Sequence, residues 1–262
     1  MALIKKPFGF GAGAARAEMS EVPQSNLVVH SRADSGVTDA GGGLVSEWEN
    51  TAGDNWFPRG TTGLSSVSTD YAPTIVPAGD VGTLSGAGYI QFPGVDERLV
   101  TNANVGSQGT NEAMHMFGVI RIDVWRTEGQ ILNTYGGGAT HLWLRGADAD
   151  KAFIIPACDG APYPQTDINI GEWFYYNTYW ADGAHVAYVQ VNNGTKETAS
   201  GNFGHSNANS PGWSGHLDLM ASEHNGGYVN ASVAEQICYS AEQTGSNLTD
   251  IEDYINGQYG LW

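Results

Sequence analysis

The sequence predicts an all-β protein, a sandwich of two antiparallel sheets followed by one short helix at its end. Stretches rich in Val, Ile, Tyr and Trp recur every ~8 to 15 residues, separated by Gly, Asn, Asp or Pro, as in sandwiches and jelly rolls. The 262 residues include 36 Gly, 12 Tyr and 8 Trp but only 11 Lys and Arg together. This balance favours strands and turns over helices, and one sandwich domain of this length is ordinary.

Residues 1–26 precede the first strand pattern and show no periodicity, so we expect an extended arm outside a domain that fills residues 27–262. On a chain of net charge −17, a basic and apolar arm is suited to docking on a protein partner. A frayed terminus is the alternative. The glycine-rich start is a poor apolar segment for a signal peptide. The docking residues would be Leu3, Ile4, Lys5, Lys6, Phe8 and Phe10.

The first half of the domain holds strands of contrasting kinds. Strands are predicted at residues 27–30, 45–50 and 89–92, whereas residues 51–84 predict either an elaborate loop or two short edge strands. Residues 116–124 are apolar on both faces, which indicates a central strand of the sandwich. One of these faces holds Met116, Ile120, Ile122 and Val124, and the other holds Phe117 and Val119.

Two hairpins are predicted in the second half. The first runs through residues 130–135, turns at three glycines and returns through 140–145. The second runs from Trp173 to Trp180, turns at Asp182-Gly183 and returns to Val191, because Asp-Gly supplies the positive φ angles of a tight turn.

The chain ends with a strand at residues 234–239 and a helix. Thr249 and Glu252 have the spacing of a capping box, which predicts the start of the helix. Gly257 can end it. The apolar sides of the predicted elements give a core of Phe92, Phe117, Val119, Ile120, Trp173, Tyr175, Val189, Leu217, Leu219, Ile237 and Ile255.

The ending resembles that of concanavalin A-like, laminin-G-like jelly-roll domains. Residues 45–50, 89–99, 116–121 and 171–194 are similar, in order and spacing, to earlier elements of that family. The resemblance implies a concanavalin A-like jelly roll over residues 27–262, a fold that hosts enzymes, lectins and structural modules alike. The matching positions at the end are Glu235, Ile237, Tyr239, Tyr254, Ile255, Tyr259, Gly260 and Leu261.

Charge and composition exclude several classes of partner. A net charge of −17 repels nucleic acid and anionic lipid, and no run approaches the ~20 apolar residues of a membrane span. Cys158 and Cys238 are too few for a disulfide framework, so we expect two reduced thiols, with a single bridge as the alternative.

No catalytic residues are expected, and we predict that the chain is not an enzyme. Glucanases that resemble this fold carry Glu-x-Asp-x-x-Glu on one strand, and that pattern is absent. Glu47 and Glu49 share a strand face but lack the rest of the motif, and no nucleophile elbow is present. No cofactor is expected. A calcium ion at the rim is the one alternative, since relatives carry one; Asp148 with Asp150, or Asp34 with Asp39, would hold it.

Glycan binding is the ligand chemistry that the composition favours. Sugar rings stack on exposed aromatic rings beside hydrogen-bonding side chains, and residues 201–213 have that composition on a predicted loop. The alternative is a polar loop whose aromatic rings pack under the sandwich edge. The candidate residues are Phe203, His205, Asn207, Asn209, Trp213, Asn225 and Tyr228.

Together these features predict a non-enzymatic surface protein of a bacteriophage virion, a head decoration or fibre component, with glycan binding as an added capacity. Its partners would be other virion proteins or further copies of itself, and a host glycan. A secreted lectin-type module is the second hypothesis. A glycoside hydrolase with atypical residues is the third.

Overall fold

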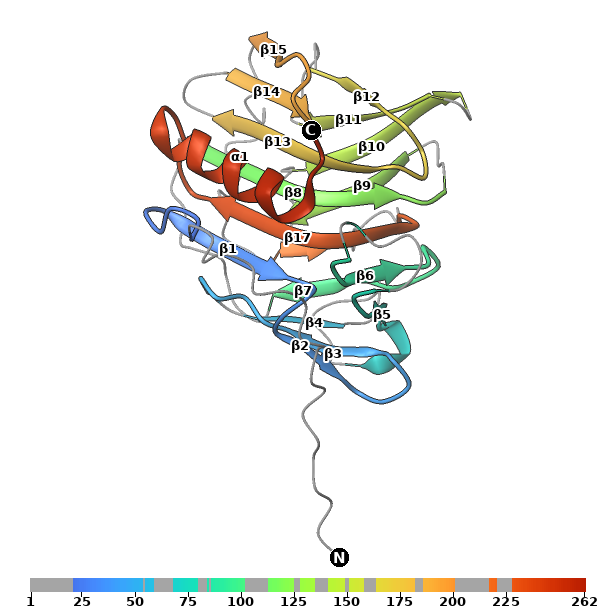
Figure 1. Ribbon diagram of the computed structural model, residues 1–262. Helices are drawn as coiled ribbons and strands as arrows, with labels where there is room; N and C mark the ends of the chain where they lie inside the picture. The colour runs from blue at the N-terminus through green and yellow to red at the C-terminus, as the bar shows by residue number, and fades with distance from the viewer. Residues whose placement is uncertain are drawn as a thin grey trace, which may run out of the picture.

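The computed structural model describes residues 21–53, 55–58, 68–79, 84, 86–101, 113–124, 128–134, 141–148, 151–157, 164–181, 186–200, 217–220 and 228–262. These residues form two antiparallel β-sheets that face each other and one α-helix near the C-terminus (Figure 1). The predicted all-β sandwich with a single C-terminal helix is confirmed.

The first sheet has the order β15-β14-β13-β8-β17-β6-β5. The long strand β17 pairs with β6 over its first residues and with β1 over the rest, so β1 continues the line of β6. The strands are β1 (Leu27–Arg32), β5 (Thr74–Val76), β6 (Tyr89–Phe92), β8 (Ala113–Ile122), β13 (Trp173–Ala181), β14 (Val186–Val191), β15 (Glu197–Ser200) and β17 (Ala231–Tyr239).

The second sheet has the order β12-β11-β10-β9-β16-β7-β4-β3-β2. A short 3-10 helix, η1 (Thr69–Tyr71), precedes β5 in the chain. The strands are β2 (Val37–Asp39), β3 (Val45–Trp48), β4 (Trp56–Pro58), β7 (Leu99–Thr101), β9 (Glu128–Thr134), β10 (His141–Asp148), β11 (Lys151–Ala157), β12 (Thr166–Ile168) and β16 (Leu217–Leu219).

The strand pairing of both predicted hairpins and the central strand are confirmed, whereas the predicted turns at residues 136–138 and 182–183 lie outside the described residues. β9 pairs with β10 and β13 with β14, while β8 lies between β13 and β17. Val124 is an exception to the predicted apolar face, since β8 ends at Ile122 and Val124 is 51% exposed. Within residues 51–84, β5 is an edge strand as predicted, whereas β4 lies inside the second sheet, between β3 and β7.

The alternation along β8 divides the apolar residues into two layers. Met116, Ile120 and Ile122 face the space between the sheets, where they join the larger core cluster. Phe117 and Val119 face the other way and pack beneath α1 (Ser246–Tyr259), which lies across the outer face of the first sheet (Figure 1).

All predicted core residues are buried except Trp173. Its ring is only half-buried, because it lies at the start of β13, where the Arg121 guanidinium covers it at 5.2 Å and Tyr89 meets it edge-on. Trp173 thus belongs to a boundary cluster rather than to the centre of the core.

The predicted helix boundaries are wrong at both ends. The helix begins at Ser246, before the expected capping box, and Gly245 caps it without a side-chain hydrogen bond. It continues past Gly257 and ends at Tyr259. Gly260 caps it, with a left-handed φ of 62° and an N–H that donates to Asn256 O at 2.7 Å. Burial of Tyr259 outweighs the ~1 kcal/mol cost of a glycine within a helix.

The chain joins the domain before the first strand. Val22 is 1% exposed and packs in the layer beneath α1, and Asn26 O accepts the N–H of Ser240 at 2.9 Å. The docking residues proposed at positions 3–10 lie outside the described residues. Nowhere in the described part is there a helix with the length and apolar character needed to cross a membrane.

Candidate functional site

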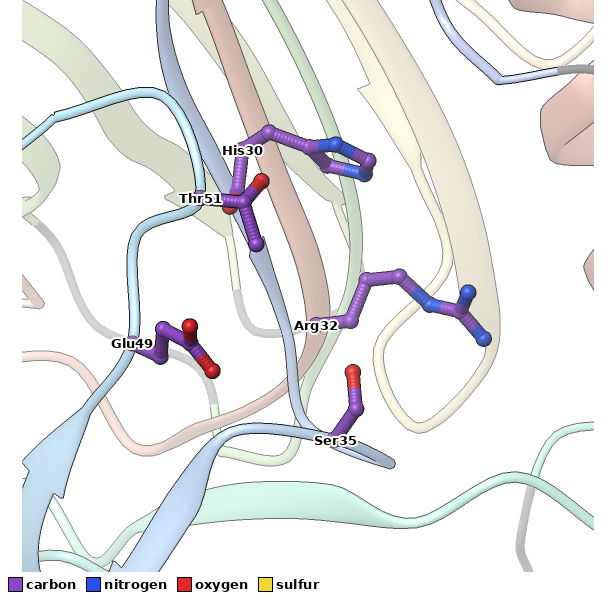
Figure 2. A pocket seen from close by; sticks show the side chains of 5 residues that line it. All are labelled: His30, Arg32, Ser35, Glu49 and Thr51. Carbon is purple, nitrogen blue, oxygen red and sulfur yellow. The ribbon is translucent and has the colours of Figure 1, made fainter.

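A small, solvent-open hollow lies beside β1, where the first sheet meets the edge of the second (Figure 2). His30 and Arg32 come from β1, and Ser35 from the turn that leads to β2. Glu49 and Thr51 come from the segment that follows β3. The five side chains are polar, so the hollow offers hydrogen-bonding groups rather than an apolar surface.

A buried asparagine fixes one side of the hollow. Asn50 Oδ1 accepts the N–H groups of His30 at 2.9 Å and Ala52 at 3.0 Å. Its Nδ2 donates to Val28 O at 3.1 Å. Because the amide serves both segments, the chain after β3 is tied to β1 along its length, and Glu49 and Thr51 stand on a fixed backbone.

A glycine makes room for Glu49. Gly36 has a φ of 71°, and its carbonyl accepts the N–H of Glu49 at 2.8 Å. A Cβ on Gly36 would lie 2.6 Å from Glu49 Cβ and 2.8 Å from Glu49 Oε2, so any larger residue would displace the carboxylate. Figure 2 shows the Glu49 carboxylate and the Ser35 hydroxyl turned toward the space between the five residues.

The positive charge at the hollow is already paired. Arg32 binds Asp34 through Nη2 and Oδ2 at 2.6 Å. Burial works against the guanidinium charge, but Tyr254, Asp34 and Glu235 outweigh it and raise the pKa of Arg32 above its ordinary value. Arg32 therefore remains charged and neutralised by Asp34. Its guanidinium extends away from Glu49 (Figure 2).

Behind His30 lies a fully buried carboxyl group, Glu235 of β17. His30 Nε2 is 2.8 Å from its Oε1, while Tyr254 donates to Oε1 at 2.9 Å and Tyr259 to Oε2 at 2.7 Å. Burial, together with Glu235, raises the pKa of both tyrosines, so they remain hydrogen-bond donors. Glu235 thus joins α1 to the sheet and holds the His30 ring at the hollow.

A second polar cluster surrounds His115 on the outer face of the first sheet. Its Nδ1 accepts the N–H of Gln243 at 2.8 Å, so the ring proton is on Nε2, 2.7 Å from Asn177 Oδ1 and 2.8 Å from the Tyr188 hydroxyl. Burial lowers the pKa of His115 to about 3. The ring has no exposed surface, so this neutral imidazole connects the segment before α1 to the sheet and takes no ligand from solvent.

The structure tests few of the predicted glycan residues. Phe203, His205, Asn207, Asn209, Trp213 and Asn225 lie outside the described residues. Tyr228 is described and is only 8% exposed, so its ring is not an open stacking surface as predicted.

The calcium and cysteine predictions are also tested only in part. Asp34 is bound to Arg32, and Asp39 accepts the N–H of Gly41 at 2.7 Å. Asp150 and the side chain of Asp148 lie outside the description. Among the described residues, no group of three or more His, Cys, Asp or Glu side chains is placed to hold a metal ion. Cys238 is a free, buried thiol whose pKa is raised to about 12 by burial, and Cys158 is not described.

Sequence reasoning missed the hollow. One signal was available: His30 and Arg32 are two residues apart on a strand, and therefore share the face opposite the buried Val29 and Ser31. A polar strand face that lies beside the edge of a sheet is a candidate ligand-binding site. The contribution of Glu49 depends on the turn geometry at Gly36, which composition does not show.

Solved structures share the fold at low sequence identity. The Trypanosoma rangeli sialidase in complex with sialic acid matches with a TM-score of 0.57, 16% identity, and coverage of 91% of this chain and 34% of that chain. The receptor binding domain of botulinum neurotoxin mosaic serotype C/D matches with a TM-score of 0.53 and 10% identity over 88% of this chain and 51% of that chain.

The binding domain of botulinum neurotoxin DC in complex with SialylT matches with a TM-score of 0.52, 9% identity, and coverage of 90% and 52% of the two chains. The present chain thus spans about half, or a third, of the length of these structures. No protein-family model and no curated protein sequence matches. At these identities the likeness shows the β-sandwich fold alone.

Proposed function

We propose that the chain is a non-enzymatic carbohydrate-binding module and that the hollow at His30, Ser35, Glu49 and Thr51 is its saccharide site. The observation that carries this proposal is the convergence of a carboxylate, hydroxyl groups and an imidazole on one open hollow at the sandwich rim. Such groups match the alternating donors and acceptors of sugar hydroxyls. Because the hollow is small and open to solvent, it would contact one sugar unit of a longer glycan from one side rather than enclose it.

The acidic residues near the hollow favour binding over hydrolysis. Most glycoside hydrolases use two carboxyl groups about 5 to 9.5 Å apart on either side of the scissile bond, whereas sialidases use a tyrosine nucleophile. Among the described residues that line the hollow, Glu49 is the one acidic residue. Glu235, nearby, is sealed beneath His30, Tyr254 and Tyr259 and has no exposed surface.

Two structural neighbours support a carbohydrate ligand by their descriptions, a complex with sialic acid and a complex with SialylT. We carry over only the class of ligand. The finer assignment of the fold, a concanavalin A-like or laminin-G-like jelly roll, is part of the same proposal and is supported by the matched positions at Glu235, Tyr254 and Tyr259, which the structure places in one hydrogen-bonded cluster.

We further propose that the module is a surface component of a bacteriophage virion, with its basic and apolar arm docked on other virion proteins. The secreted lectin is the competing placement. Mass spectrometry of purified particles tests the virion placement. Virion-associated peptides that retain residues 2–17 would support it, whereas a mature protein in the culture medium that begins after Ala17 would contradict it.

Isothermal titration of the full chain with a panel of neutral, acidic and amino-sugar oligosaccharides tests the binding function. We expect saturable binding to at least one saccharide, a large loss in the variant Ser35→Ala/Thr51→Val, and no new reducing ends after prolonged incubation. Absence of binding across the panel would remove the proposal, and release of reducing ends would assign the chain to the hydrolases.

A further inference from the structure

We propose that the saccharide recognised at the hollow carries a positive charge, an amino sugar with a free ammonium group such as glucosamine. The inference rests on the proposed function and narrows its ligand class. It follows from which charges at the hollow are paired and which are open.

Glu49 is the open charge. Its side chain is exposed, and its carboxylate is turned into the hollow (Figure 2). In the described part of the chain, the ion pairs involve other acidic residues, and no Lys, Arg or His is within ion-pair distance of Glu49. Gly36 has no Cβ, and a Cβ there would lie 2.8 Å from Glu49 Oε2, so the glycine leaves the space in which this carboxylate lies.

Arg32 is the group that would attract an acidic sugar, but its guanidinium is already paired with a carboxylate. It is bound to Asp34 at 2.6 Å and points away from Glu49. An anionic sugar would have to compete with Asp34 for the guanidinium and would also face Glu49. Among the described residues, Arg32 is paired with Asp34 and Glu235 is buried beneath His30, so Glu49 is the carboxylate open to a ligand at the hollow, on a chain of net charge −17. The local field therefore favours cations and repels carboxylated sugars.

The hydroxyl groups match the remaining needs of an ammonium group. An ammonium has three N–H donors and no acceptor, so it requires up to three oxygen acceptors. The Thr51 hydroxyl donates its proton to His30 O at 3.1 Å, which leaves its lone pairs for a ligand donor. Glu49, on the same segment as Thr51, and Ser35, on the turn before β2, supply further oxygens (Figure 2). An N-acetylated sugar, which has one amide N–H and no charge, would use this set poorly.

The test is isothermal titration calorimetry of the full chain at pH 6.0 with three probes: a glucosamine tetramer, its fully N-acetylated counterpart and sialyllactose. We expect the glucosamine tetramer to bind at least ten times more tightly than the other two. Glu49→Gln keeps the size of the side chain and removes its charge, so it should weaken glucosamine binding about tenfold or more and leave the N-acetylated probe unchanged.

The matched control is Asp167→Asn, which removes an exposed carboxylate from β12, at the opposite edge of the second sheet from β2. It changes the net charge by the same amount and should alter no affinity. Its invariance would show that the Glu49→Gln effect is local rather than a consequence of total charge.

The outcomes separate this inference from the function on which it rests. Binding of the N-acetylated or sialylated probe as tightly as glucosamine, with no effect of Glu49→Gln, would overturn the amino-sugar assignment and leave carbohydrate binding intact. No binding of any probe would overturn both. If a lysine-containing peptide of residues 1–20 bound in a Glu49-dependent manner while every saccharide failed, the hollow would be a docking site for the arm instead, and the inference would be wrong.

Discussion

The buried histidine at the outer face of the first sheet should make the protein lose stability as the pH falls through the range 6.5 to 3. His115 has no exposed surface, and its pKa is lowered from 6.5 to about 3 by burial. On acidification the unfolded chain takes up the proton first, so the stabilisation from neutral His115 is complete above pH 6.5 and declines below it. With these two values, the loss between pH 7.5 and pH 5.0 is about 2 kcal/mol, at 1.36 kcal/mol per pKa unit.

Urea denaturation of the parent and of His115→Gln at several pH values between 7.5 and 5.0 would isolate this contribution. The substitution removes the titrating group. When the pH is lowered from 7.5 to 5.0, the free energy of unfolding of the variant should therefore fall by about 2 kcal/mol less than that of the parent. The comparison depends on the two pH slopes, so a general loss of stability in the variant does not affect it. Parallel slopes would refute the reasoning and would mean that His115 takes up protons in the folded state.

Three further predictions concern packing and strain. Phe117→Ala should lower the free energy of unfolding by ~3–5 kcal/mol, because it leaves a cavity in the layer under α1, and Trp173→Ala should lower it by less, because the Trp173 ring is half-buried; equal losses in denaturant titrations would contradict the boundary position of Trp173. Tyr259→Phe removes a hydrogen bond to Glu235 and should cost ~1.5–3 kcal/mol in the same assay, and an unchanged stability would show that the cluster does not hold α1. Gly36→Ala should weaken saccharide binding, whereas Gly42→Ala, at nearly the same φ but with no atom within 4 Å of its new Cβ, should only destabilise by ~1–2 kcal/mol; equal affinities of the two variants would argue against a role for Gly36 in placing Glu49.

The strand pattern was largely predictable, because a strand buried on one or both faces must carry its apolar residues at a period of two. β8 and the hairpin of β13 and β14 show this clearly, since their alternation matches the two core layers. The short strand β4 was not predictable as an interior strand. Its three residues pair with β3 and β7 through long-range contacts that leave no local signal.

The helix boundaries show where a local rule yields to tertiary packing. The capping-box spacing at Thr249 and Glu252 and the glycine at 257 are real local signals, yet the helix extends beyond both. Tyr259 lies in the last turn and donates to the buried Glu235, which stabilises helix beyond Gly257. This contact joins positions that are 24 residues apart, whereas the sequence signals for helix ends depend on residues only a few positions apart.

The site was the least predictable part. Aromatic and asparagine-rich segments drew attention to Tyr228, which is buried, while the open hollow uses a single carboxylate whose position depends on the left-handed Gly36. Nothing in the local sequence distinguishes Glu49 from the other acidic residues of a strongly acidic chain.

Amide chemical-shift mapping during titration with the glucosamine tetramer would test most directly the claim that the hollow is the saccharide site. The account predicts that the saturable shifts concentrate at residues 30–36 and 49–52, and that Glu49→Gln abolishes them at the same ligand concentration. Saturable shifts confined to other parts of the chain, with residues 30–36 and 49–52 unmoved, would contradict it.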